Sequence, residues 1–137
     1  MIVIPIVVAT TFAVLGLLHF YWAIFGIKNP ELVLPTKSSK EKVSLPSSFM
    51  TTMVGLGLLL FALVFANSAF QFWSVGWLHY FQIAVGIIFL VRAIGDFKYA
   101  GFFKSVKGTP FAKMDTKYYA PLCLVLAILI AISVLIA

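Results

Sequence analysis

The amino-acid sequence predicts an all-α membrane protein with four transmembrane helices in an antiparallel bundle, forming one domain over residues 1–137. Hydrophobic residues make up 63% of the chain and the mean hydropathy is +1.11. Charged residues make up only 10%, whereas they make up about one quarter of a soluble domain. The ten basic and four acidic residues all lie in two segments, 28–42 and 92–117. The three stretches outside these segments are apolar and long enough to cross a bilayer. This pattern excludes a soluble globular domain, a disordered chain and a nucleic-acid partner.

The charge-free stretches place the helices in order along the chain. The first helix is expected at about residues 2–26, and it reads as a retained span because no basic residues precede its long apolar run. The run 43–91 is too long for one helix, and Asn67, Ser68 and the tryptophans that follow interrupt it. It therefore predicts helices at about 47–67 and 76–97 with an outer turn at 68–75. The last run predicts a helix at about 117–136.

The basic residues predict the orientation. All ten Lys and Arg residues fall in the expected loops 27–46 and 98–116 or in the adjoining ends of the third and fourth helices. Cytoplasmic loops carry an excess of Lys and Arg, so both loops are expected in the cytoplasm, with both termini outside. The net charge of +6 is thus interpreted as a topology signal.

The two halves of the chain resemble each other weakly. An offset of 70 residues aligns Leu15-Gly16-Leu17-Leu18 with Val85-Gly86-Ile87-Ile88 and Lys28 with Lys98. The alignment is consistent with two parallel-repeated hairpins, as in some transporters. Chance similarity between two apolar helices explains it equally well, so both interpretations stay open.

Four side chains are candidates for a polar ligand pocket in the inner half of the membrane. Arg92 and Asp96 are spaced i and i+4 on the third expected helix, so they share a face and can pair. His19 and Trp22 lie at a comparable depth on the first helix. An ionisable residue within a span costs about 2.5–3.5 kcal/mol, which favours a function. The structural alternatives are that Arg92 reaches the interface and that His19 bonds a neighbouring helix.

The residues around the start of the fourth helix have expected structural roles. Asp115 is interpreted as the N-cap of that helix and Pro121 as a residue of its first turns. Tyr118 is expected in the interfacial belt or turned inward toward the pocket. Gly95, beside Asp96, permits the close approach of a backbone or a ligand.

No catalytic or metal-binding motif is present, so neither a metal nor a cofactor is expected, and a non-enzymatic function is favoured. The second loop interleaves phenylalanines with lysines, which is typical of a segment that lies on anionic lipid at the cytoplasmic face.

Two stretches carry a resemblance to a known family: His19-Phe20-Tyr21-Trp22-Ala23, and the run from Arg92 to Pro121 that contains Arg-Ala-Ile-Gly-Asp-Phe and Asp-Thr-Lys-Tyr-Tyr-Ala-Pro. They resemble a family of small bacterial four-span membrane proteins, the domain of unknown function three-nine-nine-five. The resemblance implies a bacterial inner-membrane location and four helices, and it implies no activity.

The favoured hypothesis is a multi-pass inner-membrane protein that binds or translocates a small ligand through the pocket of His19, Trp22, Arg92, Asp96 and Tyr118. Four helices leave little internal volume, so a translocation path would form in a homo-oligomer. The alternatives are a membrane-embedded enzyme acting on a lipid or quinone, with His19 as acid/base, and a structural or accessory subunit of a membrane complex.

Overall fold

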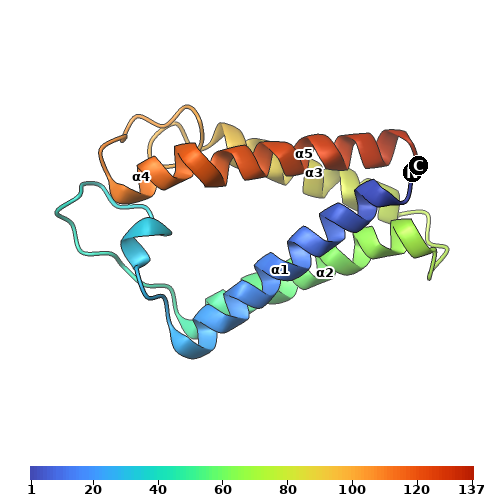
Figure 1. The fold of residues 1–137 in the computed structure, drawn as a ribbon, viewed down its shortest axis with the longest axis horizontal. Helices are drawn as coiled ribbons and strands as arrows, with labels where there is room; N and C mark the ends of the chain where they lie inside the picture. The colour runs from blue at the N-terminus through green and yellow to red at the C-terminus, as the bar shows by residue number, and fades with distance from the viewer. The chain divides into compact units, whose positions relative to one another are not determined.

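The computed structural model describes all residues from Met1 to Ala137 and contains helices but no strand. The main helices are α1 (Val3–Phe25), α2 (Ser48–Phe70), α3 (Leu78–Ile94) and a continuous helical stretch made of α4 (Pro110–Met114), η2 (Asp115–Tyr119) and α5 (Ala120–Leu135). A short 3-10 helix, η1 (Pro30–Leu32), lies in the first loop. Figure 1 shows this order along the chain. The α1, α2 and Pro110–Leu135 helices are long and apolar enough to cross a membrane, and α3 is a shorter apolar helix.

The expected helices are all present, but three of their ends differ. Helix α2 continues to Phe70 because Asn67 lies inside the helix and stabilises the turn that follows it. The Asn67 Oδ1 accepts from the Trp73 N–H at 2.7 Å, and its Nδ2 donates to the Trp73 carbonyl oxygen at 3.1 Å. Helix α3 stops at Ile94 rather than near residue 97, since Gly95 takes a φ of +90°. A positive φ ends a right-handed helix.

The last helix begins seven residues earlier than expected, at Pro110 instead of 117. The Thr109 side chain accepts a hydrogen bond from the Ala112 N–H (3.1 Å), and Pro110 occupies the first helical position. The N-cap is therefore Thr109, and the expectation that Asp115 caps this helix is wrong. Pro121 lies well inside the helix, and the wider π-helical turn of η2 precedes it, as suits a residue without an N–H donor.

The chain divides into two compact units. Unit 1 contains residues 1–26, 46–86 and 128–137, and unit 2 contains residues 27–45 and 87–127. In unit 1, α1 lies side by side with α2 (Figure 1). Their pairing places Gly16 against Gly55 and Phe12 against Phe61 and Phe65, so the two helices run in opposite directions.

Unit 1 has an apolar core that also contains a few buried polar side chains. Phe12 and Phe65 are fully buried, and their ring centroids lie 5.8 Å apart. Gly16 and Gly55 let the two backbones approach, because a Cβ on Gly16 would lie 3.0 Å from the Gly55 carbonyl oxygen. The buried Gln82 donates to the hydroxyl of Ser68, which gives its amide a partner away from water.

Unit 2 joins the two loops to the end of α3 and the beginning of the last helix. The Tyr119 hydroxyl donates to the Leu32 carbonyl oxygen at 2.8 Å and so fastens η1 to η2. The Tyr119 ring also packs on Phe111, with a centroid distance of 5.8 Å. The most buried side chains of this unit include two charged ones, Lys104 and Asp115.

Candidate functional site

The strongest candidate site is a charge cluster around Asp115 in unit 2. We call it the Asp115 cluster; it consists of Arg92, Gly101, Lys104, Asp115 and Thr116. Asp115 is 0% exposed and uses both carboxylate oxygens. Its Oδ1 accepts from Arg92 Nη2 at 2.9 Å, and its Oδ2 accepts from the Gly101 N–H at 2.7 Å and from Lys104 Nζ at 3.2 Å. Lys104 also donates to the Gly101 carbonyl oxygen (3.0 Å) and to the Thr116 hydroxyl.

The helices bring these groups together from distant parts of the sequence. Arg92 comes from the last turn of α3, where a cation is favourable at the negative end of the helix dipole. Asp115 comes from the first residue of the π-helical turn η2. Single π-helical turns occur frequently at functional sites. Lys104 comes from the loop between them, with only 2% of its side chain exposed.

The charges of the cluster do not balance. Two cationic side chains share one carboxylate, which leaves a formal charge of +1. The Nη1 atom of Arg92 is buried and has no hydrogen-bond partner, although 35% of the Arg92 side chain is exposed. A guanidinium presents its donors as a planar fork that matches carboxylate and phosphate groups. The cluster therefore carries an excess positive charge and one guanidinium donor without a partner.

In the loop that supplies Lys104, the backbone passes very close to itself at two glycines. Gly95 and Gly101 have φ values of +90° and +86°, and a Cβ on Gly101 would lie 2.4 Å from the Gly95 Cα. This close approach lets the Phe102 N–H donate to the Ala93 carbonyl oxygen at 2.8 Å. The carbonyls at the end of a helix lack partners within it, and the loop satisfies two of them, because the Phe103 N–H also donates to the Ile94 carbonyl oxygen at 3.4 Å.

Asp96 organises the same loop instead of pairing with Arg92. Its Oδ1 accepts hydrogen bonds from the backbone N–H groups of Lys98, Tyr99 and Ala100 at 2.9, 2.8 and 3.1 Å. These bonds, that from Lys98 first, hold the pKa of Asp96 below its ordinary value of 3.8. The expected Arg92–Asp96 pair is not formed because α3 ends before Asp96, so the two residues no longer share a helical face.

The other expected site residues have separate surroundings. In unit 1, His19 Nδ1 lies 2.7 Å from the carbonyl oxygen of Leu15 on its own helix, and its ring meets that of Trp22 edge-on at 5.1 Å. In unit 2, Tyr118 is half exposed, with Lys117 Nζ 5.1 Å from its ring centroid. His19 and Trp22 belong to unit 1 and Arg92 to unit 2, and the convergence of these side chains stays a prediction.

Sequence reasoning missed Lys104 and misassigned Asp115. The start of the last helix had a signal, since Thr109-Pro110 is a typical N-cap followed by a proline at the first helical position. With that start, Asp115 falls inside a helix, where a carboxylate needs a partner. Nothing in the linear pattern marks Lys104 as different from the other lysines of its loop, because its burial depends on contacts with residues 101, 115 and 116.

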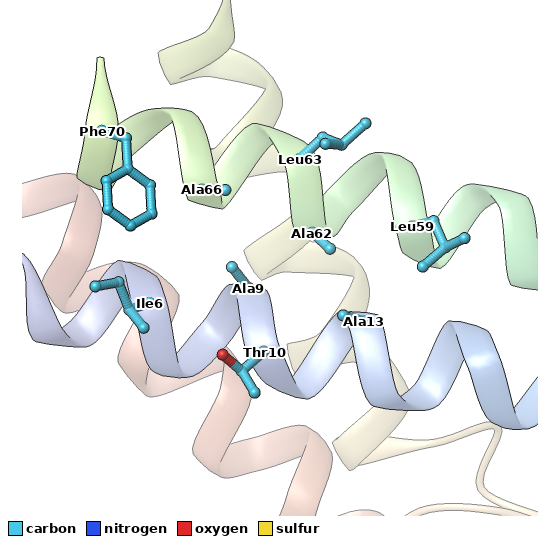
Figure 2. Close-up of a pocket in the computed structure, with 9 residues that line it drawn as sticks. All are labelled: Ile6, Ala9, Thr10, Ala13, Leu59, Ala62, Leu63, Ala66 and Phe70. Atoms are coloured by element: carbon cyan, nitrogen blue, oxygen red, sulfur yellow. The ribbon is translucent and has the colours of Figure 1, made fainter. Parts of the chain in front are cut away.

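An apolar groove of about 440 Å³ lies between α1 and α2 in unit 1. Figure 2 shows its small lining residues Ala9, Ala13, Ala62 and Ala66, with Thr10 as the only labelled side chain that carries an oxygen. The groove contains no ionisable group and so offers no acid, no base and no charged partner for an anion. No group of three or more His, Cys, Asp or Glu side chains that could hold a metal ion is present either.

Comparison with known proteins gives a family for this chain. Residues 12–130 match the family described as protein of unknown function (DUF3995). The chain belongs to this family. The match to DUF3995 includes Arg92, Lys104 and Asp115, and thus the whole Asp115 cluster. Searches among curated proteins and among solved structures find no match.

Proposed function

We propose that this DUF3995 protein is a multi-pass protein of a bacterial inner membrane that binds a small anionic ligand through Arg92 at the cytoplasmic ends of its spans. The observation that carries the proposal is the imbalance of the Asp115 cluster: two cations, one carboxylate, and a buried Arg92 Nη1 without a partner. A phosphate or carboxylate oxygen would complete the hydrogen bonds of the guanidinium and offset the excess charge.

The proposed topology is an antiparallel bundle of four spans with both loops in the cytoplasm. Three features support it: three helices of sufficient length, a fourth apolar helix, and basic residues confined to the two loops and the helix ends that adjoin them. Both chain ends belong to unit 1, together with the turn between α2 and α3. An even number of spans puts both termini on one side, which under the positive-inside rule is the outside.

The cluster favours anion binding over a purely structural role for one reason. A carboxylate that only fastened the loop to the last helix would need Lys104 and the Gly101 N–H, and these already occupy its Oδ2. Arg92 adds a second cation with 35% of its side chain exposed, in a position to reach a ligand as well as Asp115. The structural interpretation predicts instead that Arg92 serves Asp115 alone.

The test measures the thermal unfolding of the purified protein in detergent with inorganic phosphate, with acetate, and with a short-chain phosphatidic acid. A ligand at a hundred times its Kd stabilises the folded state by about 2.7 kcal/mol. We expect at least one anion to raise the Tm of the wild type and to leave that of Arg92→Met unchanged. A response to phosphatidic acid alone identifies a lipid headgroup as the source of the anion, whereas a response to inorganic phosphate identifies a free ion.

Two matched variants complete the design. Lys117→Gln removes one exposed positive charge outside the cluster and is expected to keep the full response. His19→Ala asks whether the first helix contributes to the same pocket, and a lost response would support the five-residue pocket expected from the sequence. The proposal is wrong if no anion shifts the Tm of the wild type, or if Arg92→Met responds as the wild type does.

A further inference from the structure

The second loop exposes large aromatic side chains beside lysines. Phe97 and Phe103 are 65% and 64% exposed, and their ring centroids lie 6.4 Å apart. Lys98 follows Phe97, and the Val106 N–H donates to the Lys98 carbonyl oxygen at 2.8 Å, which brings Lys107 to the same part of the loop. We call Phe97, Lys98, Phe103 and Lys107 the Phe–Lys patch. Exposed apolar patches of this kind mark contact surfaces.

The backbone holds the patch in this position. Phe97 has a φ of +63°, a conformation that bulky residues rarely adopt. Hydrogen bonds hold it on both sides: Asp96 accepts three N–H groups just after it, and the Ser105 hydroxyl donates to the Phe97 carbonyl oxygen at 2.9 Å. Backbone strain persists only where the surroundings impose it, and it is concentrated at functional positions. The exposure of Phe97 is therefore a built feature of the loop.

The electrostatics and position of the patch identify its partner. Lys98 and Lys107 are exposed, and the carboxylate of Asp96, two residues before Lys98, is bonded to three backbone N–H groups. The loop begins at Gly95, directly after the apolar helix α3. Aromatic rings and lysines at the end of a membrane helix fit the headgroup layer, where rings enter the boundary and basic groups attract anionic lipids.

We propose that the Phe–Lys patch inserts Phe97 and Phe103 into the headgroup layer of an anionic leaflet, with Lys98 and Lys107 on the lipid phosphates. The patch then fixes the second loop to the membrane surface. This contact uses none of the side chains of the Asp115 cluster, so it holds or fails independently of ligand binding at Arg92.

Spin labelling in nanodiscs tests this contact, and the chain is well suited to it because Cys123 is the only cysteine. In a Cys123→Ala background, a nitroxide is attached at Phe103→Cys or, as a control, at Ser39→Cys in the exposed first loop. Collisions with oxygen and with a water-soluble nickel chelate report depth. We expect the label at 103 to favour oxygen, more so with phosphatidylglycerol than with phosphatidylcholine alone, and the label at 39 to favour the nickel chelate in both. Equal nickel accessibility at 103 and 39 overturns the proposal, as does a label at 103 shielded from both reagents, which indicates a protein partner.

A second labelling position leaves both phenylalanine rings of the Phe–Lys patch intact. A Cβ at Gly108 meets no atom within 4 Å, so Gly108→Cys carries a label without disturbing the loop. We expect the double substitution Phe97→Ser with Phe103→Ser to raise nickel accessibility at 108 severalfold. We expect Lys98→Gln with Lys107→Gln to abolish its dependence on phosphatidylglycerol. Unchanged accessibility in both double variants contradicts the proposal.

Discussion

The α1–α2 pair and the second loop with its helix ends are stabilised by different contacts. In the pair, the fully buried side chains Phe12 and Phe65 are apolar, and Gly16 meets Gly55. In unit 2, Asp115 is fully buried and Lys104 is 3% exposed, and both are charged. Lipid tails are as apolar as leucine, so spanning helices associate through close packing. A buried charge costs free energy unless it is paired and hydrogen-bonded, and both carboxylate oxygens of Asp115 accept such bonds.

The largest expected effect concerns Asp115. Asp115→Leu leaves Lys104 buried without its carboxylate, and breaking a buried ion pair costs about 3–5 kcal/mol. The free energy of unfolding, measured by denaturant titration in detergent, should fall by that amount. Replacing all three groups, as Arg92→Met, Lys104→Met and Asp115→Leu, should recover much of the loss, because apolar residues of similar size often substitute for a buried ion pair. A loss below about 1 kcal/mol for Asp115→Leu would mean that the charges contribute little.

The next effect concerns packing in the α1–α2 pair. Gly16→Ala places a methyl group 3.0 Å from the Gly55 carbonyl oxygen and from Leu59. Overpacking of this kind costs about 1–3 kcal/mol. Gly57 on α2 has no neighbour within 4 Å of a Cβ, so Gly57→Ala should stabilise the protein by about 0.5–1 kcal/mol through helix propensity. Thermal unfolding of the two variants separates close approach from propensity, and equal shifts would show that the glycine contact is not tight.

The smallest effect concerns Asp96 and pH. Three backbone N–H donors lower the pKa of Asp96 in the folded protein, so its stabilising contribution is present above the ordinary value of 3.8 and is lost as the pH falls through the lower folded value. Asp96→Asn should lower the free energy of unfolding at pH 7 by less than about 1 kcal/mol, since the side chain is exposed. The difference between the two proteins should shrink as the acid is titrated, and a difference independent of pH would contradict this assignment.

The parts of the fold that depend on hydropathy could be predicted from sequence. The four apolar helices follow from long runs without charged residues, because a helix satisfies the backbone hydrogen bonds of an apolar run away from water. The errors lie where charged residues were assumed to be outside a helix or to pair with sequence neighbours. Asp115 and Lys117 were interpreted as the edge of a span, although the helix begins at Pro110. Asp96 was expected within a helix that the positive φ of Gly95 ends.

The candidate site was predictable in part. The expectation that Arg92 is a key charged residue near the inner end of a span rests only on its depth in the membrane. That depth follows from the number of residues between Arg92 and the end of its expected helix. Its partner could not be found in that way. The Arg92–Asp115 and Lys104–Asp115 contacts join residues 23 and 11 positions apart, and they depend on the close approach of Gly95 and Gly101.

The length of α3 has a consequence for the bilayer. Its 17 residues give about 25 Å of helix, whereas the hydrocarbon core is about 30 Å thick. The other helices have 23, 23 and 26 residues. In the proposed four-span arrangement, α3 is subject to hydrophobic mismatch that the others are not, and the adjacent lipids must thin or its ends must be drawn inward. Its inner end carries Arg92 and the carbonyl of Ala93 that holds the second loop. In that proposed arrangement, bilayer thickness would bear on the residues that bind Asp115, and a thin membrane would be the one that strains this site least.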